Sequence, residues 1–310
     1  MIQKTQFVFK ILLLVVLFAL ERTSIRATDD TLAGDQLPIS KQVEIFGQQI
    51  NYLETGSGPN VILLHGLGDD LSVWEQTIPA LNGKYRVWAL DQIGCGRSDK
   101  PYINYRASVF VEFLHAFCKK LGIEKATLVG NSLGGWVAAA FAQAYPNMVE
   151  KLVLVGAAGY WPKHAGVEEL SREQLMRLSA SSPSAYRETL KWMLHDESIL
   201  TDAFVQQAYT AQLRRNDGYT IREFIESVLR GDDRLNGKMK QIEAPTLVVW
   251  GREDEATPLI IGEALAKEID GAQIARIDMC GHMPQFECAA AFNTALLKFL
   301  ASGLSTKVKM

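Results

Sequence analysis

Short apolar runs alternate with amphipathic helical patterns along most of this chain, and that alternation limits its fold more than any other feature. The apolar runs are typical of buried strands and lie at 43–46, 50–54, 61–64, 85–90, 127–129, 151–155, 246–250 and 273–277. Helical patterns, with apolar residues spaced three and four apart, lie at 106–121, 136–145, 260–269 and 289–300. Parallel strands need crossover connections, so this order predicts an α/β fold with a mostly parallel sheet. No helix separates the first two runs, which we expect to form an antiparallel edge.

One interval, 159–240, breaks the alternation, because helical spacing dominates there and no convincing strand occurs. We call this interval the insert. Its many large apolar residues, Trp161 among them, predict that part of it packs on the main domain and part covers a site as a lid. An insert that only stabilises the fold is the alternative. The expected organisation is therefore a core formed by 28–158 and 241–310, with the helical lid between its two parts.

A glycine-flanked serine marks the junction between a predicted strand and a predicted helix. The sequence there reads Gly130-Asn131-Ser132-Leu133-Gly134. In so tight a turn the serine backbone is strained, and glycines two residues to either side remove β-carbons that would collide. The pattern predicts that Ser132 is a nucleophile exposed at the edge of the sheet. The alternative is an ordinary glycine-rich helix start.

A nucleophilic serine needs a base and an acid that orients the base, and the later part of the chain offers both. His282 lies in a loop after the last predicted strand, where a glycine and a proline stop regular structure. Asp254 follows the predicted strand 246–250. Its neighbours Glu253 and Glu255 are alternatives, which we interpret as solvated loop charges. The order serine, aspartate, histidine predicts a catalytic triad of Ser132, Asp254 and His282.

Attack on an acyl carbon also needs backbone N–H donors for the oxyanion, and the loop 65–68 is the candidate. It follows the strand 61–64, and its glycines allow a substrate to approach the backbone closely. The predicted donors are the amides of Leu67 and of Leu133, the residue after the nucleophile. A plain turn between strand and helix is the alternative, and His65 is expected to support the loop rather than do chemistry.

Neighbours of these groups are the candidates for lining a substrate pocket. They are Gly66 in the oxyanion loop, Asn131 before the nucleophile, Met283 after the base, and Trp161 in the insert. The expected ligand is a small molecule with an apolar part.

Charge and composition exclude several other classes of function. The 310 residues carry a net charge of −3, and the basic residues are scattered, so nucleic acid is not an expected partner. The histidines lack zinc-site spacing and the carboxylates form no calcium loop, so no metal is expected. The four cysteines are too sparse for a disulfide framework and are expected to be free thiols; a bridge between Cys280 and Cys288, which flank the His282 loop, is the alternative. Nothing in the sequence sets an oligomeric state.

The N-terminus has the form of a signal peptide. Lys4 and Lys10 precede the apolar run 11–20, which is short for about 30 Å of hydrocarbon. We expect residues 1–27 to be removed on export, to the periplasm or outside the cell. Membrane anchoring by residues 7–20 is the alternative.

Together these motifs resemble those of the α/β-hydrolase-fold enzymes over nearly all of the chain after the leader. The matching stretches are His65-Gly66-Leu67-Gly68, the loop 91–99, the serine motif 130–134, the segment 251–254 and Gly281-His282. The resemblance implies an eight-stranded, mostly parallel sheet with helices on both faces. It also implies a site at the carboxyl ends of the strands and hydrolysis without a cofactor.

The resemblance leaves a choice of reaction. We expect an esterase, in which Ser132 attacks a carboxylic ester, because haloalkane dehalogenases and epoxide hydrolases place aspartate at the nucleophile position. The alternative is carbon–carbon cleavage of a vinylogous diketone, as in the ring-fission-product hydrolases, whose serine motif and lid this chain resembles in part. Those enzymes usually have tryptophan where this chain has Met283, and their lid arginine aligns near Ala208. A hypothesis of another class is a non-catalytic protein that keeps the fold as a ligand pocket.

Overall fold

The computed structural model describes residues 39–162 and 167–303. The expected leader, 1–27, lies outside the described residues. Within the described ranges, no helix combines the length and the apolar character that a membrane crossing requires.

An eight-stranded sheet forms the centre of the described structure, in the order β1-β2-β4-β3-β5-β6-β7-β8. Its strands are β1 (Lys41–Ile45), β2 (Gln48–Thr55), β3 (Asn60–Leu64), β4 (Arg86–Leu90), β5 (Ala126–Asn131), β6 (Val149–Val155), β7 (Thr246–Gly251) and β8 (Gln273–Ile277). Strands β3 to β8 pair in parallel. Strand β2 is antiparallel to both β1 and β4. The expected α/β fold and its antiparallel edge are therefore confirmed, and each strand lies within a few residues of its predicted position.

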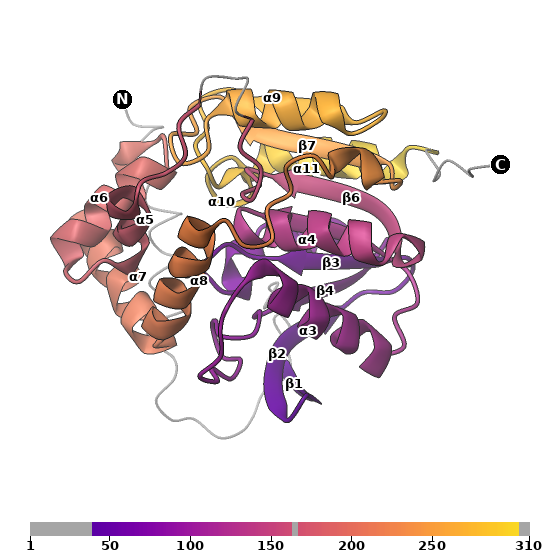
Figure 1. Ribbon diagram of the computed structural model, residues 1–310, viewed down its shortest axis with the longest axis horizontal. Helices are drawn as coiled ribbons and strands as arrows, with labels where there is room; N and C mark the ends of the chain where they lie inside the picture. The colour runs from indigo at the N-terminus through magenta and orange to yellow at the C-terminus, as the bar shows by residue number, and fades with distance from the viewer. Residues whose placement is uncertain (1–38, 163–166, 304–310) are drawn as a thin grey trace, which may run out of the picture. The chain divides into compact units, whose positions relative to one another are not determined.

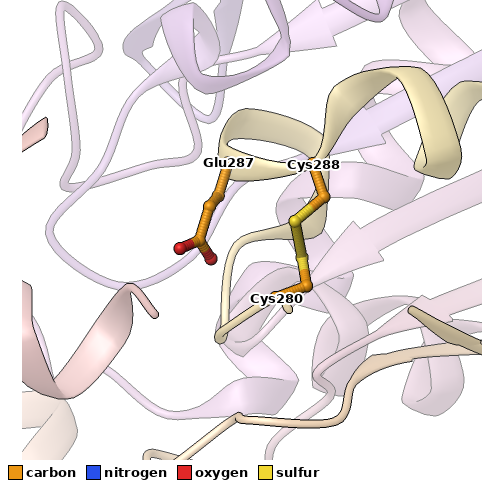
Figure 2. Close-up of side chains that lie close together, drawn as sticks. All are labelled: Cys280, Glu287 and Cys288. Carbon is orange, nitrogen blue, oxygen red and sulfur yellow. A yellow bond between two sulfur atoms is a disulfide. The ribbon is translucent and has the colours of Figure 1, made fainter. Parts of the chain in front are cut away.

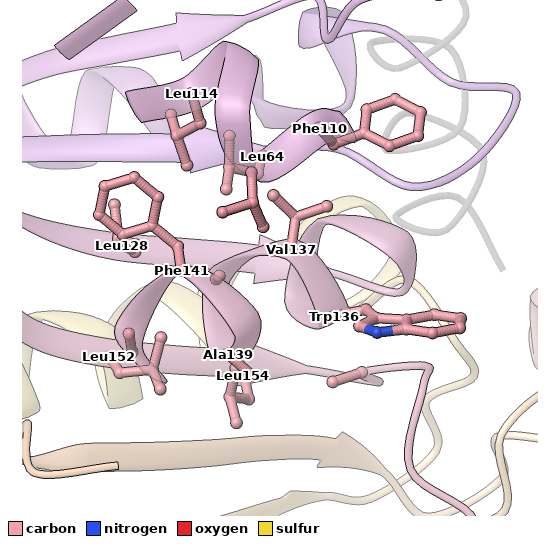
Figure 3. Close-up of a cluster of buried hydrophobic side chains, with 14 of the residues drawn as sticks. Leu64, Phe110, Leu114, Leu128, Trp136, Val137, Ala139, Phe141, Leu152 and Leu154 are labelled. Atoms are coloured by element: carbon pink, nitrogen blue, oxygen red, sulfur yellow. The ribbon is translucent and has the colours of Figure 1, made fainter. Parts of the chain in front are cut away.

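Each face of this sheet has its own apolar core, because successive strand residues point to opposite faces. Leu64, Leu128 and Leu154 belong to one core, which also contains helices α3 (Ala107–Lys120), α4 (Leu133–Ala144) and α9 (Leu259–Glu268). Figure 3 shows part of this core, with side chains of α3 and α4 packed against the strands. Alternate residues such as Val129 and Val155 belong to the second core, with α11 (Ala289–Ala301) and the short helices η1 (Leu71–Trp74) and α2 (Ile78–Leu81). Helices thus cover both faces.

Helix α4 differs from its predicted bounds, because it begins at Leu133 and not at 136. The glycines at its start weaken the helical pattern in the sequence. In the structure Ser132 is itself the N-cap of α4, so strand β5 is joined to the helix by this single residue.

Helices are the regular elements of the insert where the structure describes it, in 159–162 and 167–240, and loops connect them. Its elements are α5 (Arg172–Met176), η4 (Arg177–Ser179), α6 (Pro183–Met193), η5 (Glu197–Ile199), α7 (Asp202–Arg215), α8 (Gly218–Arg230) and η6 (Met239–Gln241). Helices α5, α6 and α7 lie together to the left of the sheet in Figure 1. The Phe224 ring of α8 packs edge-on against the Trp136 ring of α4, with 5.5 Å between centroids. One side of the insert therefore belongs to the main core.

The remaining short helices lie in the connections. They are η2 (Pro146–Met148), which precedes β6, and α10 (Pro284–Glu287), which follows the His282 loop and leads into α11.

Candidate active site

The backbone of Ser132 has the strain that the serine motif predicts. Its φ of 54° and ψ of −116° lie outside the regions that non-glycine residues usually adopt. A β-carbon on Gly130 would collide with the carbonyl of Gly134, and a β-carbon on Gly134 would collide with the carbonyl of Leu64. Neither position can carry a side chain without moving the backbone. The turn is therefore as tight as the sequence predicts, and it holds Ser132 at the end of β5.

Asp254 and His282 form a buried hydrogen-bonded pair. His282 Nδ1 lies 2.9 Å from Asp254 Oδ2, and the two residues are 2% and 5% exposed. Thr257 supports the aspartate, because its N–H donates to Asp254 Oδ1 at 2.8 Å and its hydroxyl donates to Oδ2 at 2.9 Å. The carboxylate therefore has its orientation set on two sides, and it can hold the imidazole with Nδ1 protonated and Nε2 free to accept a proton.

Backbone hydrogen bonds fix the loop that carries His282. The N–H of His282 donates to the carbonyl of Met193 in the insert at 2.7 Å. Its carbonyl accepts from Asn131 Nδ2 at 3.0 Å, and the same amide donates to the Val155 carbonyl at 3.1 Å. Asn131 thus links the turn before the serine to the loop of the histidine.

Two of the predicted pocket residues lie elsewhere. Asn131 is fully buried, and its amide is occupied by the backbone rather than directed to the pocket. Met283 packs with Leu190 and Leu194 of the insert in a separate apolar cluster. The prediction that they line the pocket is corrected for both, because backbone carbonyls bind the Asn131 side-chain NH₂ and the insert buries Met283 in that cluster.

Leu67 and Leu133 both lie at the wall of the pocket beside Ser132. Leu133 is the first residue of α4, so its N–H is one of those that an α-helix leaves without an internal partner. Among the described residues, the Leu67 N–H donates to no backbone carbonyl. Two amides are thus available where an oxyanion could form.

His65 supports the oxyanion loop, as expected. Its Nδ1 lies 2.7 Å from the Gly66 carbonyl, and its Nε2 accepts from the N–H of Gln92 at 3.0 Å. These partners assign the proton to Nδ1, and both ring nitrogens are occupied. His65 therefore has no nitrogen left for proton transfer to a substrate.

Ser132 and His282 open on one pocket, which has about 700 Å³ of space including open solvent at its mouth. Gly66 and Trp161 line it, as expected. Most of the remaining wall is apolar and comes from the insert, including Leu175, Trp192 and Phe224. No lysine or arginine is among the described residues that line this pocket. The pocket suits an apolar ligand.

Asp69 is the one acidic side chain in the described lining, and the sequence prediction missed it. Its Oδ2 would lie 3.2 Å from a β-carbon on Gly66, and that position is 3.4 Å from the Ser132 β-carbon. Burial raises the pKa of the Asp69 carboxyl above its ordinary value, although the Arg215 guanidinium acts in the opposite direction. The acid follows a glycine-rich loop, and nothing in the local sequence distinguishes it from an exposed loop charge.

Thr257 is a second residue that the sequence prediction missed. Besides its two bonds to Asp254, its hydroxyl lies 3.1 Å from His282 Nδ1 and 3.2 Å from the Gly156 carbonyl. A threonine three residues after an aspartate is a common turn pattern, so the sequence contains no signal specific to this contact.

Cys280 and Cys288 form a disulfide beside the His282 loop, with Glu287 next to them (Figure 2). The potential ligand atoms of these three residues lie within 4.8 Å of one another. Because the two sulfurs are bonded to each other, they offer no thiolate for a metal. Among the described residues, Cys95 and Cys118 are the free cysteines, and both are buried. Burial raises the pKa of Cys118 to about 12, which makes it an unreactive thiol.

Comparisons with known proteins agree with this arrangement. A family model described as alpha/beta hydrolase fold matches residues 59–289. The 2-hydroxy-6-oxononadienedioate/2-hydroxy-6-oxononatrienedioate hydrolase of Paraburkholderia phymatum is 33% identical over 288 residues, which cover 87% of this chain and 99% of that protein.

Solved structures show the same likeness. The meta-cleavage product hydrolase CumD of Pseudomonas fluorescens IP01, solved as a mutant with acetates, has a TM-score of 0.74 and 31% identity, covering 84% of this chain and 97% of that one. A membrane phospholipase A has a TM-score of 0.72 and 26% identity, covering 84% and 85%. With its sheet, its strained serine and these matches, the chain belongs to the α/β-hydrolase family of enzymes.

Proposed function

We propose that this enzyme hydrolyses a carbon–carbon bond in a vinylogous diketone, with Ser132 as nucleophile, His282 as base and Asp254 as the orienting acid. The observation that carries the proposal is that Ser132 and His282 share one pocket wall while His282 is bonded to Asp254 behind it. The names of the relatives support the choice of reaction, since they are hydrolases of meta-cleavage products and of oxononadienedioates. These comparisons favour carbon–carbon cleavage over ester hydrolysis, the reaction expected from the sequence.

The proposed reaction begins when His282 Nε2 takes the proton of Ser132 and the serine oxygen bonds to the ketone carbon. The oxyanion is stabilised by the amides of Leu67 and Leu133. When it collapses in the diketo tautomer of the substrate, the bond between the carbonyl carbon and the adjacent CH₂ carbon breaks. The electron pair leaves as a conjugated dienolate, which takes the proton from His282 and becomes the dienol. Water, activated by the same base, then hydrolyses the acyl-serine and releases a carboxylic acid.

The shape of the pocket supports an apolar acyl part. Side chains of the insert, such as Leu175 and Phe224, cover the space in front of Ser132 with hydrocarbon, so an aryl or alkyl group there loses contact with water. We propose on the same ground that the insert acts as the lid.

Ester hydrolysis is the second candidate, and the charge of the pocket favours it. A dienoate substrate carries a carboxylate, and such a charge is costly to bury without a cation. The described lining offers no lysine or arginine, and it places the Asp69 carboxyl in the same space. A neutral ester avoids both penalties. The structural likeness to a phospholipase is compatible with this candidate.

Labelling with a fluorophosphonate tests the catalytic serine that both candidates share. Wild-type protein should be labelled, Ser132→Ala should not, and Ser198→Ala, which removes an exposed serine in η5, should be labelled at the wild-type rate. Labelling of Ser132→Ala, or no labelling of folded wild-type protein, would refute the nucleophile assignment.

A substrate panel then separates the two reactions. It contains a 2-hydroxy-6-oxo-dienoate with a phenyl or alkyl group on its ketone and p-nitrophenyl esters with the same acyl groups. The proposal requires kcat/KM to be higher for the dienoate than for the matched ester. The reverse order would overturn carbon–carbon cleavage in favour of the second candidate.

We also propose that the protein is exported. The disulfide supports this, because such bonds persist in oxidising compartments. Fractionation of cells that produce the full chain should find the protein outside the cytoplasm, and deletion of residues 1–27 should retain it in the cytoplasm. Wild-type protein found in the cytoplasm would contradict the proposal.

A further inference from the structure

The loop that carries the base, residues 280–283, touches the insert directly. The N–H of His282 donates to the carbonyl of Met193, the last residue of α6. A β-carbon on Gly281 would lie 2.6 Å from the same carbonyl, so the two backbones are in close contact. The position of the base therefore depends on where this end of the insert lies.

Glu287 joins the same two segments through its side chain. Its Oε2 accepts from the N–H of Gly281 at 2.6 Å, and its Oε1 accepts from the N–H of Asp196 at 2.6 Å. Both distances are short for N–H donors, as is usual when the acceptor is a carboxylate. One donor belongs to the loop of His282 and the other to the insert, 91 residues away from Glu287 in the chain. One carboxylate thus spans the junction.

Two other groups hold the His282 loop through bonds that involve no residue of the insert. The disulfide ties Cys280 to Cys288 at the end of α10, beside Glu287 in Figure 2. Glu253 accepts from the N–H of Cys280 at 2.9 Å, and its own N–H donates to the Cys280 carbonyl at 3.0 Å. Both fix the loop to the core.

We propose that Glu287 is a positioning residue that couples the α6 end of the insert to the loop of His282. The inference rests on the proposed function in one respect, which is that His282 is the base for Ser132. When the insert sits as in this structure, both N–H groups reach the carboxylate and the imidazole is held in place. When residues 193–196 move away, the carboxylate loses one donor, and Gly281 loses a rigid partner.

The substitution Glu287→Gln tests the coupling with little change of shape. A carboxamide has one acceptor oxygen, so its NH₂ group would face one of the two N–H donors. Two readouts are needed: the saturable rate of labelling by a fluorophosphonate, and deuterium exchange of backbone amides in residues 193–200 and 280–283. Because misplaced catalytic groups cost rate rather than binding, the limiting labelling rate should fall roughly tenfold while the half-saturating concentration stays within about twofold. Exchange should rise in both segments.

Glu253→Gln is the matched control, since it weakens the same loop from the core side. It should raise exchange in 280–283 and leave 193–200 unchanged. If it raises exchange in 193–200 as much as Glu287→Gln does, the coupling is not specific to Glu287 and the proposal fails. Wild-type labelling and exchange in Glu287→Gln would also overturn it.

A second variant, Glu287→Asp, keeps the proposal testable if Glu287→Gln folds poorly. Glu287→Asp keeps the charge but is one methylene shorter, so it can reach at most one of the donors, and it should give the same pattern in milder form. Wild-type behaviour of Glu287→Asp would count against the coupling. If labelling does not depend on Ser132, the proposed function fails, whereas the exchange data still decide the coupling between the segments.

Discussion

The substitution Gly134→Ala probes the turn that holds Ser132, in both stability and activity. Gly134 is the second residue of α4, where alanine would ordinarily be the better helix former. In this structure the added β-carbon would collide with the carbonyl of Leu64 and lie 2.7 Å from that of His65. Both obstacles are backbone atoms, and Leu64 pairs with Leu90 and Gly130 on its two sides.

The size of the effect follows from these contacts. A carbon and a carbonyl oxygen in contact lie about 3.3 Å apart or more, so the added β-carbon must move away from the Leu64 carbonyl, the nearer obstacle, by roughly 1 Å. Forcing an extra carbon into a well-packed site costs about 1–3 kcal/mol in free energy of unfolding. A displacement of reacting groups by about 1 Å can lower a rate by roughly 100-fold. We therefore expect a loss of about 2 kcal/mol and a 10- to 100-fold slower labelling by fluorophosphonate.

Urea unfolding and labelling kinetics measure the two effects on the same preparations. The matched control is Gly218→Ala in α8, also near a helix start, where the nearest atom to the added β-carbon is 3.7 Å away. It should change the free energy of unfolding by less than about 1 kcal/mol and leave labelling unchanged. If Gly134→Ala matches wild type in both measurements, the turn tolerates a side chain and the argument from its geometry is wrong.

Three further predictions concern single polar side chains. Asp254→Asn should lower the labelling rate about ten-thousand-fold without loss of folding, because the amide no longer holds His282 in the required tautomer. A labelling rate lowered by less than about tenfold in rapid labelling assays would contradict this. Because burial raises the pKa of Asp69, ionising this carboxyl destabilises the fold. The penalty is absent below the ordinary carboxyl pKa, grows as the pH rises toward the raised value, and is complete above it. Asp69→Asn should therefore raise the unfolding temperature most at alkaline pH, and it should lower KM for an anionic dienoate. An equal rise in unfolding temperature at every pH would refute the raised pKa of Asp69. Lys151 is buried and donates to the carbonyls of Phe299, Leu300 and Ser302, so Lys151→Met should cost about 2 kcal/mol in urea unfolding, with no change in labelling per folded molecule.

Local patterns in the sequence were sufficient to predict the sheet and the serine turn. Buried parallel strands need continuous apolar runs, and helices that cover a sheet need one apolar face. Both therefore leave a pattern of apolar residues in the sequence that can be recognised without the structure. The glycines around Ser132 likewise act on atoms only a few residues away. The expected start of α4 was three residues late, because those same glycines weaken the helical signal.

The contacts that surround the reactive residues were decided by tertiary structure. Asn131 was expected in the pocket, but its amide bonds the carbonyl of His282, 151 residues later in the chain. Glu287 and Asp69 occupy ordinary loop and helix-end positions in the sequence, and their surroundings come from the insert and the core together. A residue's own neighbours determine its backbone conformation, whereas its partners across the fold determine what its side chain can do. The chain order therefore predicted which residues could react, and the packing of distant segments determined which others hold them in place.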